Sequence, residues 1–466
     1  MTAMIENRTF DEIAIGDSAS LSRTLTEQDI QLFAAVTGDV NPAHLDTEYA
    51  EGSLFHHVIA HGMWGGGLIS AVLGTELPGP GTIYLRQSLE FVRPVALGDT
   101  ITATVTATAR VAEHRHVTFA CVCTNQKGQD VIRGEALVMA PAEKICRPRI
   151  ALPDVRVAGH AAGERLIALA REGGAPVVTA VVHPCSAIAI QSALEAAEAG
   201  LIAPVLVGPE VKIRRAAADA GLDITGLPIE AVAHSHAAAE RAVELVRSGA
   251  ATMLMKGSLH TDELISAVIA RDGGLRTGRR ISHVYVMQVP GRAAPLLITD
   301  AAINVEPTLE DKRDIIANAI DLAHVIGIAE PKVAILAAVE NVNPAMRSTL
   351  DAAALCKMAD RGQITGGVLD GPLAFDNAVS ESAAREKGIV SPVAGRADIL
   401  VVPNLEAGNM LAKQLTFLGG AEAAGVVLGA RVPIMLTSRA DSLPTRLASC
   451  AVGVLMSRVA SGAVPE

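Results

Sequence analysis

An acid and an imidazole lie close together near the start of the sequence, at Asp39 and His44. The turn between them contains Asn41-Pro42, which favours a tight reversal that points both side chains at one small molecule. Such a pair can take a proton from water and give one to carbon, as addition of water across a double bond requires. Asn41 is a candidate substrate-binding residue, and the backbone N–H of Gly62, at the start of an expected helix, suits an oxyanion. By residue type alone, the segment could equally be a structural turn with His44 on the surface.

A hydroxyl and a guanidinium are adjacent far along the chain, at Ser438 and Arg439, shortly after the apolar run 432–436. Residues that follow a buried strand project from the edge of a sheet. There a guanidinium can hold two phosphate oxygens and a hydroxyl can donate to a carbonyl oxygen, which suits acyl transfer to phosphate. Taken alone, the pair could also be a helix cap with a surface salt bridge.

Other polar residues at the ends of apolar runs are expected to line the same cleft as Ser438 and Arg439. Lys256 begins a turn that opens a helix, a geometry that favours anions. The basic segment 275–280 could bind phosphates or be a solvated loop. The remaining candidates are Asp300, Asn304 and Asp370 and, for phosphate groups, Arg276 and Arg279.

The composition limits the class of protein. At 466 residues, the chain exceeds one ordinary hydrophobic core, so two or three domains are expected. Half of the residues are hydrophobic but only 2% are aromatic, and a core of Ala, Val, Ile and Leu favours α/β layers. The formal net charge of −11 argues against non-specific binding to nucleic acid.

Cysteine usage and hydropathy bear on metals and on location. The six cysteines are scattered, without a C-x-x-C pair or a histidine-rich partner set, so no metal site is expected and the thiols are expected to be reduced. The first residues lack the apolar core of a signal peptide. The longest charge-free run, 175–194, is broken by His183-Pro184 and is a poor membrane span. We therefore expect a cytoplasmic protein without a membrane partner.

Residues 1–140 are expected to form an α+β domain. Thr26 suits the N-cap of a helix that ends near Gly38, and the helical stretch 62–73 contains three consecutive glycines, so a close approach is expected there. The alternating segment 99–111 begins a series of antiparallel strands. Successive strands wrapped around one apolar helix predict a hotdog-type fold. His56, His57 and His61 also cluster in this part of the chain.

The rest of the chain changes in character. Residues 141–154 contain three prolines and several charges, which is typical of a linker. Between 155 and 466, short apolar runs alternate with helical stretches, which predicts parallel, doubly wound sheets. Because about 310 residues exceed one such sheet, we expect two α/β lobes with a cleft between them, the first lobe including the C-terminal segment.

The N-terminal region resembles the MaoC-like, (R)-specific enoyl-CoA hydratase family. The resemblance covers about Phe10 to Ala140 and includes the segments 33–39, 41–46, 59–63, 77–85 and 91–95. It implies a dimerising hotdog fold with an acyl tunnel beside the central helix. Asp39 and His44 match the family's catalytic pair, and Gly62 matches its oxyanion position. We expect the bulky Trp64 to shorten the tunnel and favour short acyl chains.

The C-terminal region resembles the phosphate acetyl/butyryltransferase family from about Val155 to Ala460. The matching segments are 255–257, 274–279, 333–342, 351–363, 370–378, 406–409 and 436–442. The resemblance implies a homodimer that converts acyl-CoA and phosphate to acyl phosphate and CoA, with Ser438 and Arg439 as the active-site pair. Thr445 stands where the family's acetyltransferases have an aspartate, the proposed base for the thiol, and Asp441 or phosphate could replace it.

Together these features predict a bifunctional enzyme, an enoyl-CoA hydratase joined to a phosphate acyltransferase of the acetyl or butyryl range. An alternative is an active hydratase with a non-catalytic, CoA-binding or oligomerising C-terminal module. Coenzyme A thioesters and inorganic phosphate are the expected substrates, and no tightly bound cofactor is expected. Both resemblances imply a homodimer or a higher even-numbered assembly.

Overall fold

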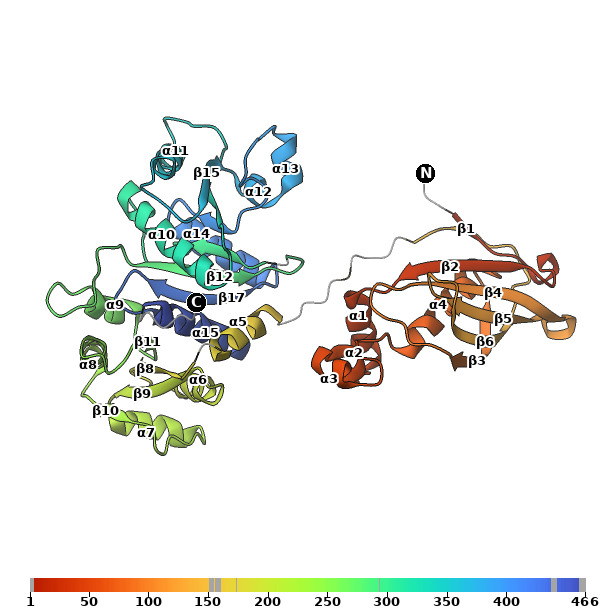
Figure 1. Cartoon of the computed structure of the whole chain (residues 1–466), viewed down its shortest axis with the longest axis horizontal. Helices are drawn as coiled ribbons and strands as arrows, with labels where there is room; N and C mark the ends of the chain where they lie inside the picture. Colours follow the sequence, from red (N-terminus) through yellow and green to blue (C-terminus); the bar gives the residue numbers. More distant parts are fainter. Residues whose placement is uncertain are drawn as a thin grey trace. The chain divides into compact units, whose positions relative to one another are not determined.

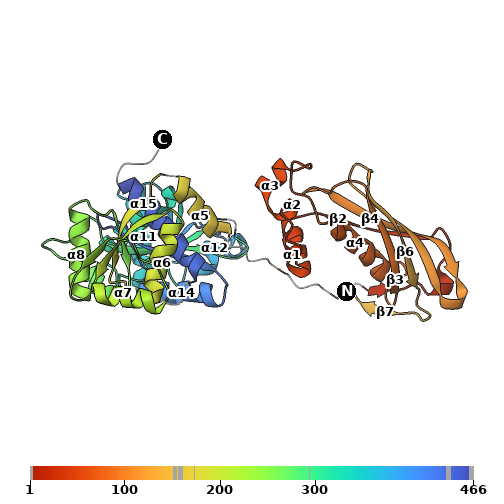
Figure 2. The same ribbon diagram turned by 90° about the horizontal axis from the view of Figure 1, so that it is seen from below.

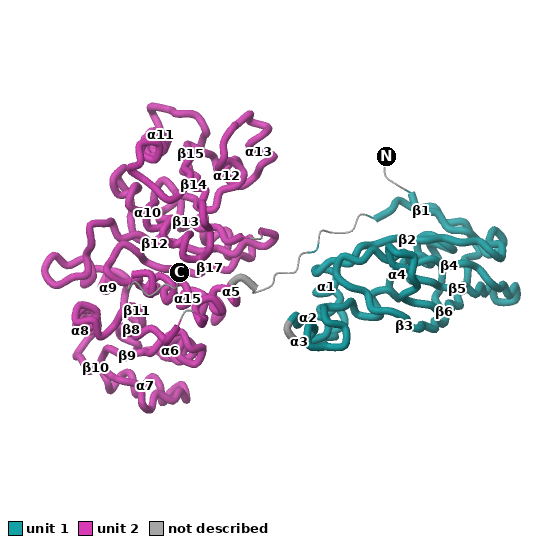
Figure 3. Tube along the Cα trace, viewed as in Figure 1, with its two compact units in different colours: residues 1–157 teal, residues 158–466 magenta. Residues whose placement is uncertain are grey.

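The computed structural model describes residues 4–150, 155, 161–172, 174–292, 294–436 and 442–460. The chain divides into two compact units, Met1–Val157 and Ala158–Glu466 (Figure 3). Each unit has its own sheet and its own hydrophobic core.

The first unit is a five-stranded antiparallel sheet that surrounds one apolar helix, α4 (Gly62–Thr75), as Figure 2 shows. Its strands follow the order β2 (Ser18–Thr24), β4 (Thr100–Val111), β5 (His116–Thr124), β6 (Asp130–Met139) and β3 (Ile83–Phe91). Along β4, alternate residues from Ile101 to Ala107 are buried and the threonines between them face outward, because side chains alternate along a strand. The predicted hotdog fold is confirmed.

The glycines of α4 are used unequally. A methyl group on Gly65 would overlap Ile132 Cδ1, and one on Gly66 would lie 3.1 Å from Leu89 Cδ1. Gly67 has no heavy atom within 4 Å of the same position. The sheet therefore approaches the helix closely at two of the three predicted glycines, and Gly67 faces away from it.

Short helices carry the chain from the sheet to the candidate site. Thr26 caps α1 (Glu27–Thr37) by accepting from Asp29 N, and Gly38, with φ of 75°, ends the helix. Helices α2 (Pro42–Leu45) and α3 (Thr47–Gly52) follow directly. Two 3-10 turns complete the unit, η1 (Phe10–Glu12) and η2 (Ala112–His114).

Part of the interval expected to be a linker, 141–154, is structured within the first unit. Strand β7 (Cys146–Pro148) pairs with β1 (Met4–Glu6). The Asn7 side chain donates to Glu143 O at 2.8 Å and accepts from Ile145 N at 2.9 Å. These hydrogen bonds, made with residues more than a hundred positions away, explain why composition alone suggested a free segment.

The second unit is built on one continuous sheet of eleven strands (Figure 1). The order is β10 (Ile229–Ala231), β9 (Ile202–Gly208), β8 (Val177–Val182), β11 (Met253–Lys256), β18 (Ile434–Met435), β17 (Glu422–Leu428), β12 (Ser282–Gln288), β13 (Leu296–Thr299), β16 (Ile399–Val401), β14 (Lys332–Leu336) and β15 (Val368–Leu373). The first five strands in this order, from β10 through β9, β8 and β11 to β18, are parallel to one another. The last four, from β13 through β16 and β14 to β15, are also parallel to one another. Three antiparallel pairings join these two blocks, so the sheet is mixed but largely parallel.

Helices cover both faces of each block. The first block lies among α5 (Ala161–Glu172), α6 (Ala187–Glu198), α7 (Glu210–Asp219), α8 (Ser235–Arg247) and α9 (Thr261–Ile269). The second lies among α10 (Leu309–Val325), α11 (Arg347–Asp360), α12 (Phe375–Val379), α13 (Glu381–Glu386) and α14 (Leu405–Phe417). Each block has one core cluster per face, which gives the expected two lobes, although they share a sheet.

The last helix, α15 (Leu443–Ala460), belongs to both lobes. Its Ala448 and Val452 lie in a core cluster of the second lobe, and its Cys450 and Ala451 lie in one of the first. Across the described parts of both units, no helix is long and apolar enough to cross a membrane.

Candidate active sites

The turn after α1 is held by the side chain that was expected to bind substrate. Asn41 caps α2, because its Oδ1 accepts from Ala43 N at 3.1 Å. Asp39 Oδ1 accepts from Asn41 N at 3.3 Å. These contacts place Asp39 shortly before α2 and His44 within it, and they give Asn41 a positioning role.

The hydrogen bond of His44 defines its tautomer. His44 Nδ1 lies 2.8 Å from the carbonyl oxygen of Ile59, which can only accept a hydrogen bond, so Nδ1 carries the proton. The lone pair of the neutral ring is therefore on Nε2. An imidazole oriented in this way can accept a proton from water at Nε2.

His61 joins this pair, although the sequence predicts no role for it. It is 2% exposed, and its Nε2 donates to the backbone carbonyl of Asp39 at 3.0 Å. Its ring centroid lies 4.0 Å from that of His44. Asp39 offers a carboxylate oxygen, and His44 and His61 each offer a ring nitrogen, and these three atoms lie within 4.8 Å of one another. The signals in the sequence are the cluster of histidines around it, its position directly before Gly62 and its place in the matching segment 59–63.

Gly62 begins α4, so its N–H belongs to the first turn, whose amides have no acceptor within the helix. A methyl group at this position would lie 2.9 Å from Phe91 Cε1, which limits the residue to glycine unless the ring moves. Gly62 adjoins the histidine that contacts Asp39, in agreement with a place beside the acid-base pair. Trp64, two residues further, is buried within the core of the unit.

In the second unit, Asp300 and Asn304 form a buried network at the end of β13. Asp300 accepts from the backbone N–H groups of Ala302, Ile303 and Asn304 at 2.9, 3.0 and 3.1 Å. Asn304 Nδ2 donates to Asp300 at 2.5 Å and to Ile281 O at 2.8 Å. Burial raises the pKa of Asp300, and its four donors oppose that rise.

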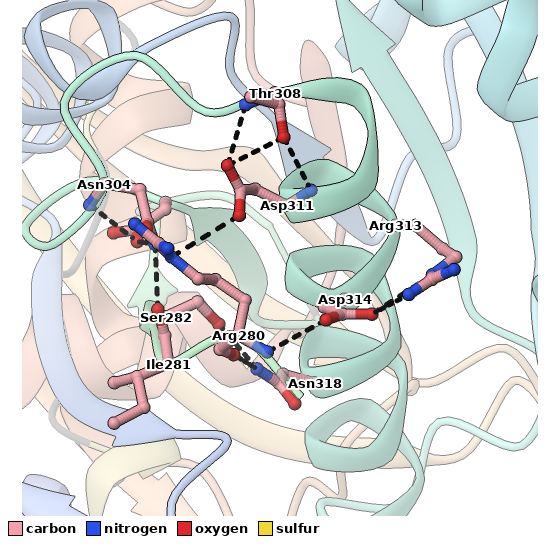
Figure 4. Close-up of polar contacts among 10 residues, drawn as sticks. Arg280, Ile281, Ser282, Asn304, Thr308, Asp311, Arg313, Asp314 and Asn318 are labelled. Carbon is pink, nitrogen blue, oxygen red and sulfur yellow. Dashed lines mark hydrogen bonds and ion pairs between the residues drawn. The ribbon is translucent and has the colours of Figure 1, made fainter. Parts of the chain in front are cut away.

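Arg280, which is exposed, joins this network through Asn304, as Figure 4 shows. Its Nε donates to Asn304 Oδ1 at 2.7 Å and lies 3.5 Å from Asp311 Oδ1. Its backbone N–H donates to Asp314 on α10 at 2.9 Å. Arg280 was not among the predicted site residues, although it lies in the predicted basic segment.

The other arginines of this segment are exposed. Arg279 forms an ion pair with Asp321 of α10. Arg276 pairs through its backbone with Ala430. Among the described residues, Arg276 and Arg279 are not in the buried network.

Lys256 ends β11 and begins a tight turn. A methyl group on the following Gly257 would overlap the carbonyl oxygen of Val182, so the chain crosses β8 where only glycine fits. Lys256 Nζ donates to Gly257 O at 3.3 Å. Ser258 Oγ donates to Ser186 Oγ at 2.9 Å, which fixes the turn against the start of α6.

The strand ends do not bring all the predicted residues together. Three antiparallel pairings separate β11 from β13, so these two strands run in opposite directions. Lys256, at the carboxyl end of β11, and Asp300, directly after β13, therefore follow opposite ends of the strands. Four strand spacings also separate them, roughly 19 Å. Asp370 lies on β15, at the far end of the strand order, and its Oδ1 accepts from Gly371 N. Short apolar runs do not reveal strand polarity, and the shared cleft stays a prediction because Ser438 and Arg439 lie outside the described residues.

Ser438, Arg439 and Asp441 lie outside the described residues. Strand β18, which precedes them, pairs with β11 so that Met435 lies beside Met255. The chain therefore leaves the sheet next to Lys256. Thr445, in the first turn of α15, accepts from Ser442 Oγ at 3.0 Å and lines a cavity of about 490 Å³ together with Gln288 and Glu422.

Residues 230–454 match the family described as Phosphate acetyl/butaryl transferase, and residues 13–125 match the MaoC like domain. A phosphate acetyltransferase of Rhizobium meliloti is 66% identical over 292 residues, which are 63% of this chain and 92% of that protein. The chain belongs to the phosphate acetyl/butyryl transferase family, with a MaoC-like domain at its N-terminus.

Solved structures are similar to both units. A branched-chain phosphotransacylase from Enterococcus faecalis is 29% identical, with a TM-score of 0.53, over 60% of this chain and 99% of that one. The unliganded R-hydratase PhaJ1 from Pseudomonas aeruginosa is 43% identical, with a TM-score of 0.33, over 34% of this chain and 100% of that one.

Proposed function

We propose that the chain is a bifunctional enzyme whose first unit hydrates a 2-enoyl thioester of coenzyme A and whose second unit transfers an acyl group between coenzyme A and phosphate. The cluster of Asp39, His44 and His61 supports the first activity. The 66% identity to a phosphate acetyltransferase supports the second and favours an acetyl group. The two reactions use one class of thioester.

In the first unit, a water molecule is held between the Asp39 carboxylate and His44 Nε2. Both groups keep lone pairs that the local hydrogen bonds do not use. As the water oxygen bonds to C3 of the enoyl group, one of these side chains takes a water proton. The π electrons move toward the thioester carbonyl, whose oxygen accepts from Gly62 N–H. A proton then passes from the site to C2, which gives the 3-hydroxyacyl thioester.

In the second unit, Arg439 holds phosphate and Ser438 donates to the carbonyl oxygen of the thioester. A phosphate oxygen attacks the carbonyl carbon, the tetrahedral intermediate collapses, and the thiolate of coenzyme A leaves. In the reverse direction the thiol must lose a proton. Thr445 is a poor base, so Asp441 or the phosphate takes that proton.

Two assays on the full chain test this assignment. Crotonyl-CoA hydration is followed by loss of the conjugated absorbance, and acyl transfer is followed by release of the thiol from acetyl-, propionyl- and butyryl-CoA with and without phosphate. Asp39→Asn should lower hydration by at least about 100-fold and leave acyl transfer intact. Arg439→Ala should do the reverse.

Loss of both activities in one folded variant would refute this division of labour. If none of the three thioesters releases thiol in a phosphate-dependent manner, the second unit is instead a coenzyme A-binding or oligomerising module. Absence of crotonyl-CoA hydration in the unaltered chain would refute the assignment of the first unit.

A further inference from the structure

The ring nitrogens of His44 and His61, beside Asp39, are oriented in a way that general acid-base chemistry does not require. Each histidine uses one ring N–H to donate a hydrogen bond to a backbone carbonyl oxygen. His44 donates to Ile59 O, and His61 donates to Asp39 O. The remaining lone pairs are on His44 Nε2 and His61 Nδ1. Histidines that bind metal ions commonly donate their other N–H to a carbonyl oxygen, which fixes the ring and raises its basicity.

His61 Nδ1 is the second observation. This atom is buried and has no hydrogen-bond partner among the described residues, in a side chain that is 2% exposed. A buried nitrogen without a partner is costly, on the order of 1–3 kcal/mol, and such an atom indicates an unseen ligand or a functional need.

The distances suit a small cation. One possible ligand atom each of Asp39, His44 and His61, a ring nitrogen for each histidine and a carboxylate oxygen for Asp39, lies within 4.8 Å of the others. A point therefore exists within about 2.8 Å of all three, the circumradius of such a triangle. Zinc bonds to nitrogen and oxygen are about 2.0–2.2 Å, so the ligands must move inward by roughly 0.6 Å each. Asp39 is exposed, so its carboxylate can rotate toward the ion, and small rotations of the two rings supply the rest of that movement. Two histidines and one carboxylate are an established zinc donor set that keeps a fourth position open.

We propose that Asp39, His44 and His61 bind a divalent transition-metal ion of the zinc class, and that the bound ion blocks hydration. The ion takes the lone pairs of Asp39 and His44 that otherwise hold the attacking water. Acyl transfer in the second unit does not use these residues. The inhibition rests on the proposed hydratase activity, whereas the metal site itself does not.

The experiment uses the chelator-treated full chain and ZnCl₂, with binding measured by titration calorimetry and confirmed by the visible absorption of Co²⁺. His61→Gln keeps a donor for Asp39 O and removes the imidazole ligand. His57→Gln, at a nearby exposed histidine, is the matched control. Asp39→Asn is a second ligand variant at an exposed position, where folding is not at risk.

We expect the unaltered chain and His57→Gln to bind one zinc ion that His61→Gln does not bind, or binds at least tenfold more weakly. Asp39→Asn should lose zinc binding in the same way as His61→Gln. Zinc should inhibit hydration in the first two proteins over the concentration range in which the site fills, without inhibiting acyl transfer. Equal stoichiometry and affinity in His61→Gln would overturn the site. Full hydration at saturating zinc would overturn the inhibition. If the chain hydrates nothing, the binding comparison alone decides whether the site exists.

Discussion

Two glycines two residues apart on α4 should respond oppositely to the same substitution. At Gly67 the helix is open to solvent, with no atom within 4 Å of an added methyl group. Gly67→Ala should therefore stabilise the first unit by about 0.8–1 kcal/mol, the difference in helix propensity between the two residues. Gly65→Ala brings the same gain but drives its methyl group into Ile132 Cδ1.

The clash at Gly65 determines the magnitude. Overpacking a core typically costs about 1–3 kcal/mol, so Gly65→Ala should destabilise the unit by up to about 2 kcal/mol net. Ile132→Val removes the Cδ1 atom that the new methyl group meets. Alone it should cost about 0.5–1.5 kcal/mol, but it should cost little or nothing in the Gly65→Ala background, a coupling of roughly 1 kcal/mol.

Trp64 makes the measurement specific to this unit. It is the sole tryptophan of the sequence, it lies on α4 and it is 8% exposed. Its fluorescence during urea denaturation of the full chain therefore follows the first unit alone. Midpoints are compared at unchanged slope, so that a shift reports stability and not a change in the denatured state.

The reasoning would be refuted if Gly65→Ala and Gly67→Ala shifted the midpoint equally, or if Ile132→Val failed to rescue Gly65→Ala. Either result would mean that α4 does not lie against β6 as described. A misplaced α4 would also displace the Gly62 N–H, so hydration by Gly65→Ala should fall together with its stability.

Three further predictions concern the second unit. Burial lowers the pKa of His283 to about 4, so its unfolded state takes up a proton first on acidification and stability falls by up to roughly 3 kcal/mol between about pH 6.5 and pH 4. His283→Gln should flatten this part of the dependence, measured as urea midpoints by far-UV circular dichroism at several pH values, and an unchanged slope would contradict it. Lys312 and Asp351 form a buried ion pair at 2.8 Å, so Lys312→Met should cost about 3–5 kcal/mol and the double variant with Asp351→Leu should regain most of it in thermal denaturation. Asp300→Asn turns an NH₂ group toward two of the four donors, because each carboxylate oxygen accepts from two of them, and it should cost about 2–4 kcal/mol and lower acyl transfer, while crotonyl-CoA hydration stays the same.

Local patterns predicted the local structure well. The alternation around Ile101 and the cap at Thr26 depend on neighbours a few residues away, and both are present. The glycines of α4 correctly indicated a close approach, because loss of a side chain inside a helix has a cost that packing must offset.

Features that depend on distant partners were not predictable in the same way. The two-residue strand β18 contains no information about its direction, which is set by pairing with β11 and β17. His61 gains its place from the backbone carbonyl of Asp39, an atom that every residue type has. The segment around Ile145 is ordered by Asn7, at the other end of the unit.

The position of α15 has a consequence for synthesis of the chain. The first unit is closed when β7 pairs with β1, so it can fold while the ribosome is still translating the second. The second unit is different, because β18 fills the place between β11 and β17 and α15 completes cores in both lobes. Until these last elements leave the exit tunnel, the edges of β11 and β17 stay unpaired and both cores stay open. A nascent chain stalled before residue 434 should therefore hold a finished first unit and be a strong client for chaperones through its second.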